Sequence, residues 1–375
     1  MKLRGIFFLF LLIISVVGCL NPRHKTDDAM IDRAIQNEMK RYKIPSITAC
    51  IIKGNSIIWK RAYGYANIQR KVPATIETIY LLASVSKQVT SAAVMQLHEK
   101  GTIDIDKDID NYLPFSVRNP KFPGQVITPR ILLTHRAGLA WPRGEDPDFY
   151  RIYRDDTAPG LGKWLKNYII PGGSKYNPKI WKDTKPGEVE LYSNIGGALL
   201  GFLVESVSGK DFNTYCIENI FLPLEMPNTS FRISGLDKEK IAMPYYENLT
   251  PCGHYSVPFY PSTTIKSSIA EFSHFLIAMM NGGVYKDKRV LKERTVKEIL
   301  KVQCANSWSG LLWWKYAGDW YGGEGGFLGA STTMVFKKEK GIGILIFSNR
   351  TEFNSFYPPD GRIFTLIKNK AETFF

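Results

Sequence analysis

Segments with the composition of β-strands lie near both ends of this chain, and a long region of other character separates them. Residues 47–53 and 56–61 are rich in β-branched and apolar side chains, and Gly54-Asn55 between them is a typical hairpin turn. Residues 331–336 and 342–347 have a similar composition near the C-terminus. We therefore expect an antiparallel sheet built from both ends of the chain.

Helical patterns flank these strands and fill the region between them. Apolar residues recur at helical spacing over residues 31–42, and another helical segment covers residues 362–372. Residues 102–310 are mostly helix and loop, with a strong helical stretch at 195–208. The predicted fold class is α+β, an antiparallel sheet with flanking terminal helices plus a helical insertion domain.

The first residues differ from the rest of the chain. Lys2 and Arg4 precede an apolar run at residues 6–17, which is too short to span a bilayer. A basic start followed by such a run is typical of a secretory signal. We expect a signal peptide at residues 1–18.

The apolar run ends in Val16-Val17-Gly18-Cys19, which resembles the lipobox of bacterial lipoproteins. In that family the cysteine becomes the lipidated first residue of the mature chain. The resemblance implies lipidation of Cys19, a short polar tether at residues 19–28, and an exported protein anchored to the bacterial cell membrane or outer membrane. An uncleaved or ordinary signal is the alternative.

The chain is strongly basic, with a formal net charge of +14 at pH 7, and +12 once Lys2 and Arg4 leave with residues 1–18. Lys and Arg are scattered, and we find no basic helix interleaved with aromatics and no nucleic-acid motif. The expected neighbours are anionic lipid headgroups or cell-wall polymers, and nucleic acid is not expected.

Cysteine and histidine spacing gives no sign of a metal site. The five histidines lack ligand spacing, so we expect neither a metal nor another cofactor. Cys216 lies four residues after Phe212 on a predicted helix, which indicates a buried thiol. The disulfide state stays open for the four cysteines after Cys19, none of which forms a Cys-x-x-Cys pair: Cys50, Cys216, Cys252 and Cys304.

The chain contains one Ser-x-x-Lys, from Ser84 to Lys87, where a strand-like run at residues 78–82 gives way to a helical pattern. Residues i and i+3 share a helix face, so the Ser84 hydroxyl and the Lys87 amine are expected to meet. Unpaired N–H groups at a helix start suit a developing oxyanion. The pair is a candidate nucleophile and base, while ordinary N-cap chemistry is the alternative.

Several further stretches occur in a characteristic order: residues 84–87, 97–106, 127–139, 185–187, 192–194 and 223–226. Together they resemble the serine β-lactamase and penicillin-binding-protein-like family, in particular the branch with class C β-lactamases, DD-peptidases, D-aminopeptidases and related esterases. The similarity covers about residues 30–350. It implies a β-lactamase/transpeptidase-like fold, and we assign residues 29–375 to one serine hydrolase domain.

The second motif of this family is Tyr-x-Asn, and the chain has three such triplets, beginning at Tyr65, Tyr192 and Tyr246. Only the middle one follows Lys-Pro-Gly and opens a predicted helix, as the family motif does. The resemblance makes Tyr192 the phenol that moves the proton from nucleophile to leaving group. It makes Asn194 the amide that positions Lys87 and the substrate.

A Ser-His arrangement is a competing reading, because His135 follows Leu-Leu-Thr. In the family the histidine of this stretch is structural, and a lone histidine near a turn is usually a hydrogen-bonding residue. The Gly-x-Ser-x-Gly elbow of α/β-hydrolases is absent from the sequence.

The third family motif, Lys-Thr-Gly or His-x-Gly, is altered in this chain. The alignment places Gly323-Glu324-Gly325 at the motif, so Gly323 replaces the usual cation, and a register shifted by one residue would put Glu324 there. Gly325 permits close approach to a substrate, and the Gly326 N–H is a candidate partner of the Ser84 N–H in an oxyanion hole.

The sequence thus predicts a cell-envelope serine hydrolase that cleaves an ester or amide in a small-molecule or peptide substrate, through an acyl-enzyme on Ser84. One alternative is a DD-peptidase or β-lactamase acting on peptidoglycan or β-lactams, which the missing cation disfavours. Another is a non-catalytic envelope-binding protein that keeps the fold, which the presence of Ser84, Lys87 and Tyr192 disfavours.

Overall fold

The computed structural model describes residues 22–142, 146, 149–305, 307–351 and 361–374. The predicted signal peptide and Cys19 therefore lie outside the described residues. Within the described part of the chain, no helix combines the length and the apolar character needed to cross a membrane.

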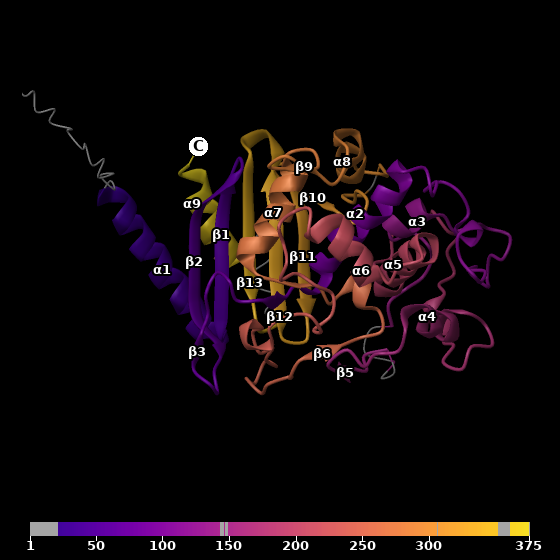
Figure 1. Cartoon of the computed structure of the whole chain (residues 1–375), viewed down its shortest axis with the longest axis horizontal. Coiled ribbons are helices and arrows are strands. Elements are labelled where there is room, and N and C mark those ends of the chain that lie inside the picture. Colours follow the sequence, from indigo (N-terminus) through magenta and orange to yellow (C-terminus); the bar gives the residue numbers. More distant parts are fainter. Residues whose placement is uncertain (1–21, 143–145, 147–148, 306, 352–360, 375) are drawn as a thin grey trace, which may run out of the picture.

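One antiparallel sheet joins the two ends of the chain, as predicted (Figure 1). The N-terminal β1 pairs with the C-terminal β13, with Ile47 opposite Ser348 and Lys53 opposite Ile342. The strand order is β10-β11-β12-β13-β1-β2-β3. The bounds are β1 Ser46–Lys53, β2 Ser56–Asn67, β3 Val72–Pro73, β10 Trp314–Tyr316, β11 Trp320–Phe327, β12 Ala330–Lys337 and β13 Ile342–Ser348.

The terminal helices α1 (Pro22–Tyr42) and α9 (Arg362–Glu372) cover one face of this sheet. Ile35 and Ile363 share a core there with alternate strand residues such as Ile344. On the other face, α7 (Ile269–Met280) packs on the remaining strand residues. The side-chain alternation of the strands thus supplies two apolar faces, each of which is covered by helix.

The helical insertion lies beside the sheet, to its right in Figure 1. Its central pair is α2 (Ser86–Glu99) against α5 (Asn194–Ser208). The other helices are α3 Pro129–Leu133, α4 Leu161–Ile169, α6 Phe212–Cys216 and α8 Glu293–Leu300, and the short strand pairs are β4 Tyr80–Leu81 with β7 Lys266–Ser267, β5 Tyr153–Arg154 with β6 Tyr255–Ser256, and β8 Val284–Tyr285 with β9 Lys288–Arg289.

Two elements differ from the sequence prediction. The strand expected at residues 78–82 is reduced to β4, which pairs with β7 outside the main sheet. Helix α1 begins at Pro22, within the segment expected as a tether, and proline is well suited to a first helical position.

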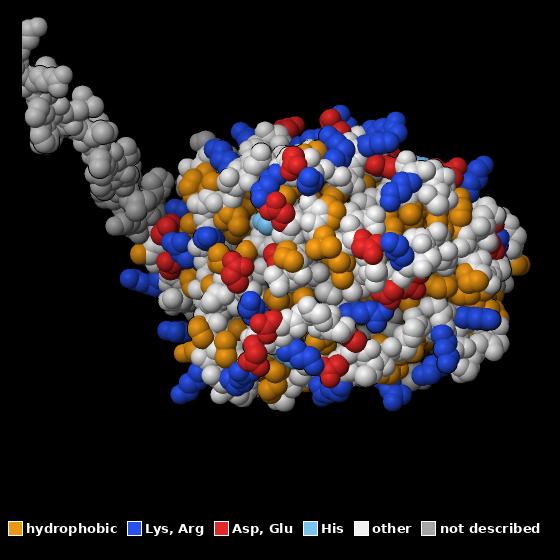
Figure 2. All heavy atoms as spheres, in the orientation of Figure 1, with side chains coloured by type: hydrophobic (Ala, Val, Ile, Leu, Met, Phe, Trp, Pro, Cys, Tyr) orange, Lys and Arg blue, Asp and Glu red, His pale blue; other side chains and the backbone are white. Residues whose placement is uncertain are grey.

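Cys50, Cys216 and Cys252 are buried and Cys304 is partly exposed, and all four are free thiols. The buried position of Cys216 on α6 agrees with its prediction. On the surface, Lys and Arg are interspersed with Asp and Glu over the face in Figure 2.

Candidate active site

Ser84 lies in a single 3₁₀ turn, η1 (Ala83–Val85), directly before α2. Ala83 has a φ of +48°, a left-handed conformation that is strained for a residue with a Cβ. The Ser86 hydroxyl holds the turn, because it donates to the Ala83 carbonyl at 2.6 Å and accepts from the Ile265 N–H at 3.0 Å. The turn leaves Ser84 partly exposed at the start of α2.

Lys87 lies one helical turn later and is buried, with 2% of its surface exposed. Its Nζ is 3.1 Å from Ser84 Oγ, as the i, i+3 spacing predicts. The same nitrogen donates to Asn194 Oδ1 at 2.7 Å and to the Ser262 carbonyl at 2.8 Å. Burial lowers the pKa of Lys87 well below its usual range.

Three oxygen atoms surround Lys87 Nζ and can serve either protonation state, and the lowered pKa of Lys87 favours the neutral amine. A neutral lysine amine has two N–H groups and one lone pair. When the amine is neutral, Asn194 and the Ser262 carbonyl can accept its two N–H groups, and its lone pair can then accept the proton of the Ser84 hydroxyl. Chemically, the arrangement can remove a proton from Ser84.

Tyr192 and Asn194 come from the start of α5, where the Ser193 side chain caps the helix by accepting from the Gly196 N–H at 3.0 Å. Tyr192 OH donates to Ser84 Oγ at 2.7 Å, and Lys87 Nζ lies 4.7 Å from the centre of the Tyr192 ring. Burial, with a smaller contribution from Glu324, raises the pKa of Tyr192, which therefore stays protonated at neutral pH.

His135 lies beside this group and forms no hydrogen bond with Ser84, and both residues belong to the part of the chain that the structure describes. Its ring centre lies 4.7 Å from that of Tyr192 in a tilted arrangement, and its Nδ1 accepts from the Ser193 N–H at 3.2 Å. Burial, followed by the nearby Lys87, lowers the pKa of His135 to about 3. A neutral imidazole that holds the Tyr192 segment is a positioning residue, in agreement with its expected structural role.

The other two Tyr-x-Asn triplets lie elsewhere. Tyr65 is on β2 and 47% exposed, and Asn67 accepts from the Arg70 N–H in a turn. Asn248 likewise accepts from the Thr250 N–H two residues later. Both asparagines serve local turns, as short polar side chains commonly do.

Gly325 lies on β11 where this strand passes the nucleophile. A Cβ at Gly325 would lie 2.3 Å from the Leu82 carbonyl and 3.0 Å from the Ser84 nitrogen. The close approach therefore needs glycine, and it is held by Thr332 Oγ1, which donates to the same Leu82 carbonyl at 2.8 Å. Gly326 follows on the strand, and its place in an oxyanion hole with the Ser84 N–H stays a prediction.

Gly323, the position of the missing cation, faces α2. A Cβ there would lie 2.2 Å from Gln88 Nε2. Gln88 is 2% exposed and donates to the Leu312 carbonyl at 2.7 Å. The Gln88 side chain thus occupies the space into which any residue larger than glycine at position 323 would project.

Two of these contributors were missed by the sequence analysis. The Ser262 carbonyl accepts from Lys87, and the Ser262 hydroxyl donates to the Asn194 carbonyl at 2.6 Å. Gln88 shapes the strand side of the site. Neither residue belongs to a recognised motif. The glycine at position 197 on α5 is a weak sequence sign that another segment packs closely there, because a Cβ at Gly197 would lie 2.5 Å from Ser262 Oγ.

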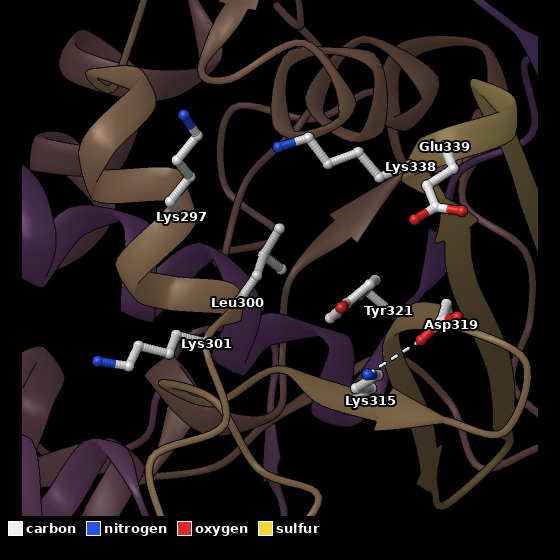
Figure 3. A pocket seen from close by; sticks show the side chains of 8 residues that line it. All are labelled: Lys297, Leu300, Lys301, Lys315, Asp319, Tyr321, Lys338 and Glu339. Carbon is white, nitrogen blue, oxygen red and sulfur yellow. Dashed lines mark ion pairs between the residues drawn. The ribbon is translucent and has the colours of Figure 1, made fainter.

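A separate basic pocket of about 390 Å³ lies at the other end of β11 (Figure 3). Lys297 and Lys338 have their ammonium groups on one side of it, and Lys315 is paired with Asp319 at 2.9 Å. Tyr321, four residues before Gly325, is the β11 residue in its wall. Across the described residues, no group of three or more His, Cys, Asp or Glu side chains is placed to hold a metal ion.

The sequence of this chain is similar to those of several known proteins. The sequence matches the Beta-lactamase family over residues 31–363. It is 23% identical over 344 residues to Protein flp of Staphylococcus aureus, covering 88% of this chain and 64% of flp. It is 27% identical over 311 residues to a putative D-alanyl-D-alanine carboxypeptidase of Escherichia coli, covering 72% of this chain and 68% of that protein. The chain thus spans less than two thirds of the length of flp.

Two solved structures have the same fold. An octameric penicillin-binding protein homologue from Pyrococcus abyssi superposes with a TM-score of 0.70 at 22% identity, over 92% of this chain and 78% of that one. A penicillin-binding protein from Bacillus halodurans gives a TM-score of 0.70 at 21% identity, over 91% and 99%. These matches confirm the predicted β-lactamase/transpeptidase-like fold.

Proposed function

The chain belongs to the Beta-lactamase family, and from this premise we propose that it is a serine hydrolase that cleaves an ester or amide through an acyl-enzyme on Ser84. The observation that carries the proposal is the closed contact set of Lys87 Nζ with Ser84, Asn194 and Ser262. A buried neutral amine whose N–H groups are held by other acceptors can take the proton of a neighbouring serine hydroxyl, which makes the serine oxygen an activated nucleophile.

In acylation, Lys87 removes the Ser84 proton and Ser84 Oγ attacks the substrate carbonyl carbon. The Ser84 and Gly326 N–H groups stabilise the oxyanion that forms. Tyr192, whose hydroxyl already contacts Ser84 Oγ at 2.7 Å, protonates the leaving group, and its proton is replaced from Lys87. In deacylation, Tyr192 and Lys87 activate water, which releases the acid and restores the Ser84 hydroxyl.

Trapping the intermediate tests this proposal. The purified protein is mixed with a small neutral p-nitrophenyl ester, quenched in acid and mapped by peptide mass spectrometry. We expect turnover and a transient acyl adduct on Ser84. Turnover without a Ser84 adduct, persisting in Ser84→Ala, would contradict it. Absence of both turnover and adducts with every ester and amide tried would favour the non-catalytic envelope-binding protein.

A DD-peptidase or β-lactamase is the second candidate, supported by the putative carboxypeptidase among the relatives. The β11 geometry argues against it. Gly323 carries no cation to attract a substrate carboxylate, Gln88 fills the adjoining space, and Glu324 adds an acid. We therefore expect weak or absent hydrolysis of penicillins, cephalosporins and D-Ala-D-Ala peptides.

We also propose export and lipid anchoring through Cys19, which the sequence features of residues 1–19 support. Intact-mass analysis of membrane-extracted protein should show a chain that starts at Cys19 and carries acyl groups. A multiply acylated cysteine holds a protein firmly at a membrane, whereas one chain binds marginally. Unchanged membrane attachment of a correctly cleaved Cys19→Ala protein would show that the basic surface holds it instead.

A further inference from the structure

Glu324 is the one side chain larger than hydrogen in the stretch from Gly322 to Gly326 on β11. The Cβ positions of Gly323 and Gly325 face Gln88 and the Ser84 turn. Side chains alternate along a strand, so Glu324 projects from the opposite side of the same segment. It therefore presents a carboxyl group from the strand segment that passes the nucleophile.

The edge of β11 is open at this point. Strand β10 pairs with Trp320, Tyr321 and Gly322 and ends there, so within the described residues the segment from Gly323 onward has β12 as its only strand partner. A substrate that reaches Ser84 can therefore lie along this edge. Glu324 is partly exposed and remains accessible to it.

Glu324 is also within electrostatic reach of the catalytic phenol, because its carboxylate contributes to the raised pKa of Tyr192. Burial raises the pKa of Glu324 itself to about 7, against a hydrogen bond with Tyr316 on β10 that lowers it. No Lys or Arg in the described part of the chain forms an ion pair with Glu324. Among the described residues, the carboxyl group is thus an acid without an ion-pair partner, directly before Gly325 on the strand and within electrostatic reach of Tyr192.

We propose that Glu324 is a specificity-determining residue that selects substrates with an alkylammonium group on the leaving-group side of the scissile bond. The inference rests on the proposed function. An ammonium near Glu324 gains a partner that the protein does not supply, whereas a carboxylate meets a like charge. Gly323 supplies no positive charge that would offset this repulsion of a substrate carboxylate.

Matched esters test this directly. One acyl group is joined to choline, to the neutral isostere 3,3-dimethylbutanol, or to 4-hydroxybutanoate as the anionic alcohol, and acid release is followed in a pH-stat at pH 8. The quantity measured is the ratio of kcat/KM for the cationic to the neutral ester. Comparing this ratio between variants removes the intrinsic difference in leaving-group reactivity.

We expect Glu324→Gln to lower the cationic-to-neutral ratio about tenfold and to raise the anionic-to-neutral ratio. The matched control is Glu339→Gln, which removes one exposed carboxylate from the β12–β13 connection and should leave both ratios unchanged. Unchanged ratios in Glu324→Gln, with the esters still turned over, would overturn the inference and leave the proposed function intact. Absence of turnover and of a Ser84 adduct in the unmodified protein would overturn both.

A measurement on the unmodified protein covers the case in which Glu324→Gln does not fold. Choline and 3,3-dimethylbutanol are compared as competitive inhibitors of neutral ester hydrolysis. Choline should inhibit at about tenfold lower concentration, because it alone carries the charge. Equal inhibition by the two alcohols would overturn the inference.

Discussion

The two sides of the candidate active site differ in the residues that form them and in how those residues are paired. On the helical side, the buried Lys87, Asn194 and Ser262 form a hydrogen-bond network that reaches the partly exposed Ser84. On the strand side, β11 offers glycines and one acid, Glu324, without a protein counter-ion among the described residues. In the proposed function these two sides have separate tasks: the helical side activates Ser84, and the strand side selects the substrate ends that fit beside it.

The largest expected loss of turnover comes from substitutions on the helical side. Ser84→Ala should lower turnover of a neutral ester by at least about a thousandfold, because the attacking oxygen is lost. Lys87→Ala should be nearly as damaging, and the double variant no worse than either, since nucleophile and base act as a unit. Kinetics with circular dichroism as a folding control check this. If the losses of turnover added up in the double variant, Ser84 and Lys87 would not act as a unit.

Tyr192→Phe should lower kcat about a hundredfold or more with little change in substrate binding, because only the proton-relaying hydroxyl is removed. Tyr65→Phe is the matched control, from the triplet that begins at an exposed tyrosine on β2. Steady-state kinetics on both variants make the comparison. Equal rates for the two would mean that Tyr192 is structural.

The glycines of β11 should differ from one another. Gly325→Ala places a Cβ 2.3 Å from the Leu82 carbonyl, which is backbone and cannot step aside, so turnover should fall about a hundredfold through the displaced Ser84 turn. Gly323→Ala meets the end of the Gln88 side chain and should cost about 1–3 kcal/mol of stability through the lost bond to Leu312. Urea unfolding and ester kinetics are measured on both. A larger loss of turnover in Gly323→Ala would reverse the assignment of these positions.

Turnover should also depend on pH through Lys87. Only the neutral amine accepts the Ser84 proton, so kcat/KM for a neutral ester should fall about tenfold per unit as pH drops below the lowered pKa of Lys87. It should hold on the alkaline side, because the pKa of Tyr192 is raised. Repeating the profile in Glu324→Gln removes the carboxyl that titrates at about 7. An acid limb that persists in Lys87→Ala would refute the assignment.

The smallest expected effect is a change in substrate preference when a cation is introduced on the strand side. Gly323→Lys alone should be poorly tolerated, because Gln88 occupies the space, whereas Gly323→Lys with Gln88→Ala should accept the new side chain. Relative to Gln88→Ala, the double variant should raise kcat/KM for carboxylate-bearing esters by about tenfold. An unchanged preference in a folded double variant would mean that position 323 does not contact the substrate.

Much of the fold was predictable because its signals are local. Composition and alternation located β1, β2, β12 and β13, and the helical pattern at 362–372 coincides with α9. The strand expected at residues 78–82 was overestimated, since its length depends on pairing with β7, nearly two hundred residues away in the chain. The bounds of such short strands are set by tertiary contacts that local composition does not carry.

The site was predictable where its residues sit in short motifs. Ser84 and Lys87 are neighbours on one helix face, and the Tyr192 triplet has recognisable flanks, so spacing and resemblance were enough to bring them together. Ser262 and Gln88 were not found, because the first contributes a backbone carbonyl from a short 3₁₀ helix, Tyr260–Ser262, and the second acts by occupying space. Neither function depends on a residue type that a sequence pattern would single out.

The most direct test compares two probes that differ in what they require of the strand side. A fluorophosphonate needs only the activated Ser84, whereas a fluorescent penicillin also presents a carboxylate to Gly323 and Glu324. Peptide mapping after exposure of the unmodified protein to each should show a Ser84 adduct with the fluorophosphonate and little or none with the penicillin. Penicillin labelling of Ser84 at a comparable rate, or no fluorophosphonate adduct at Ser84, would contradict this division of the site.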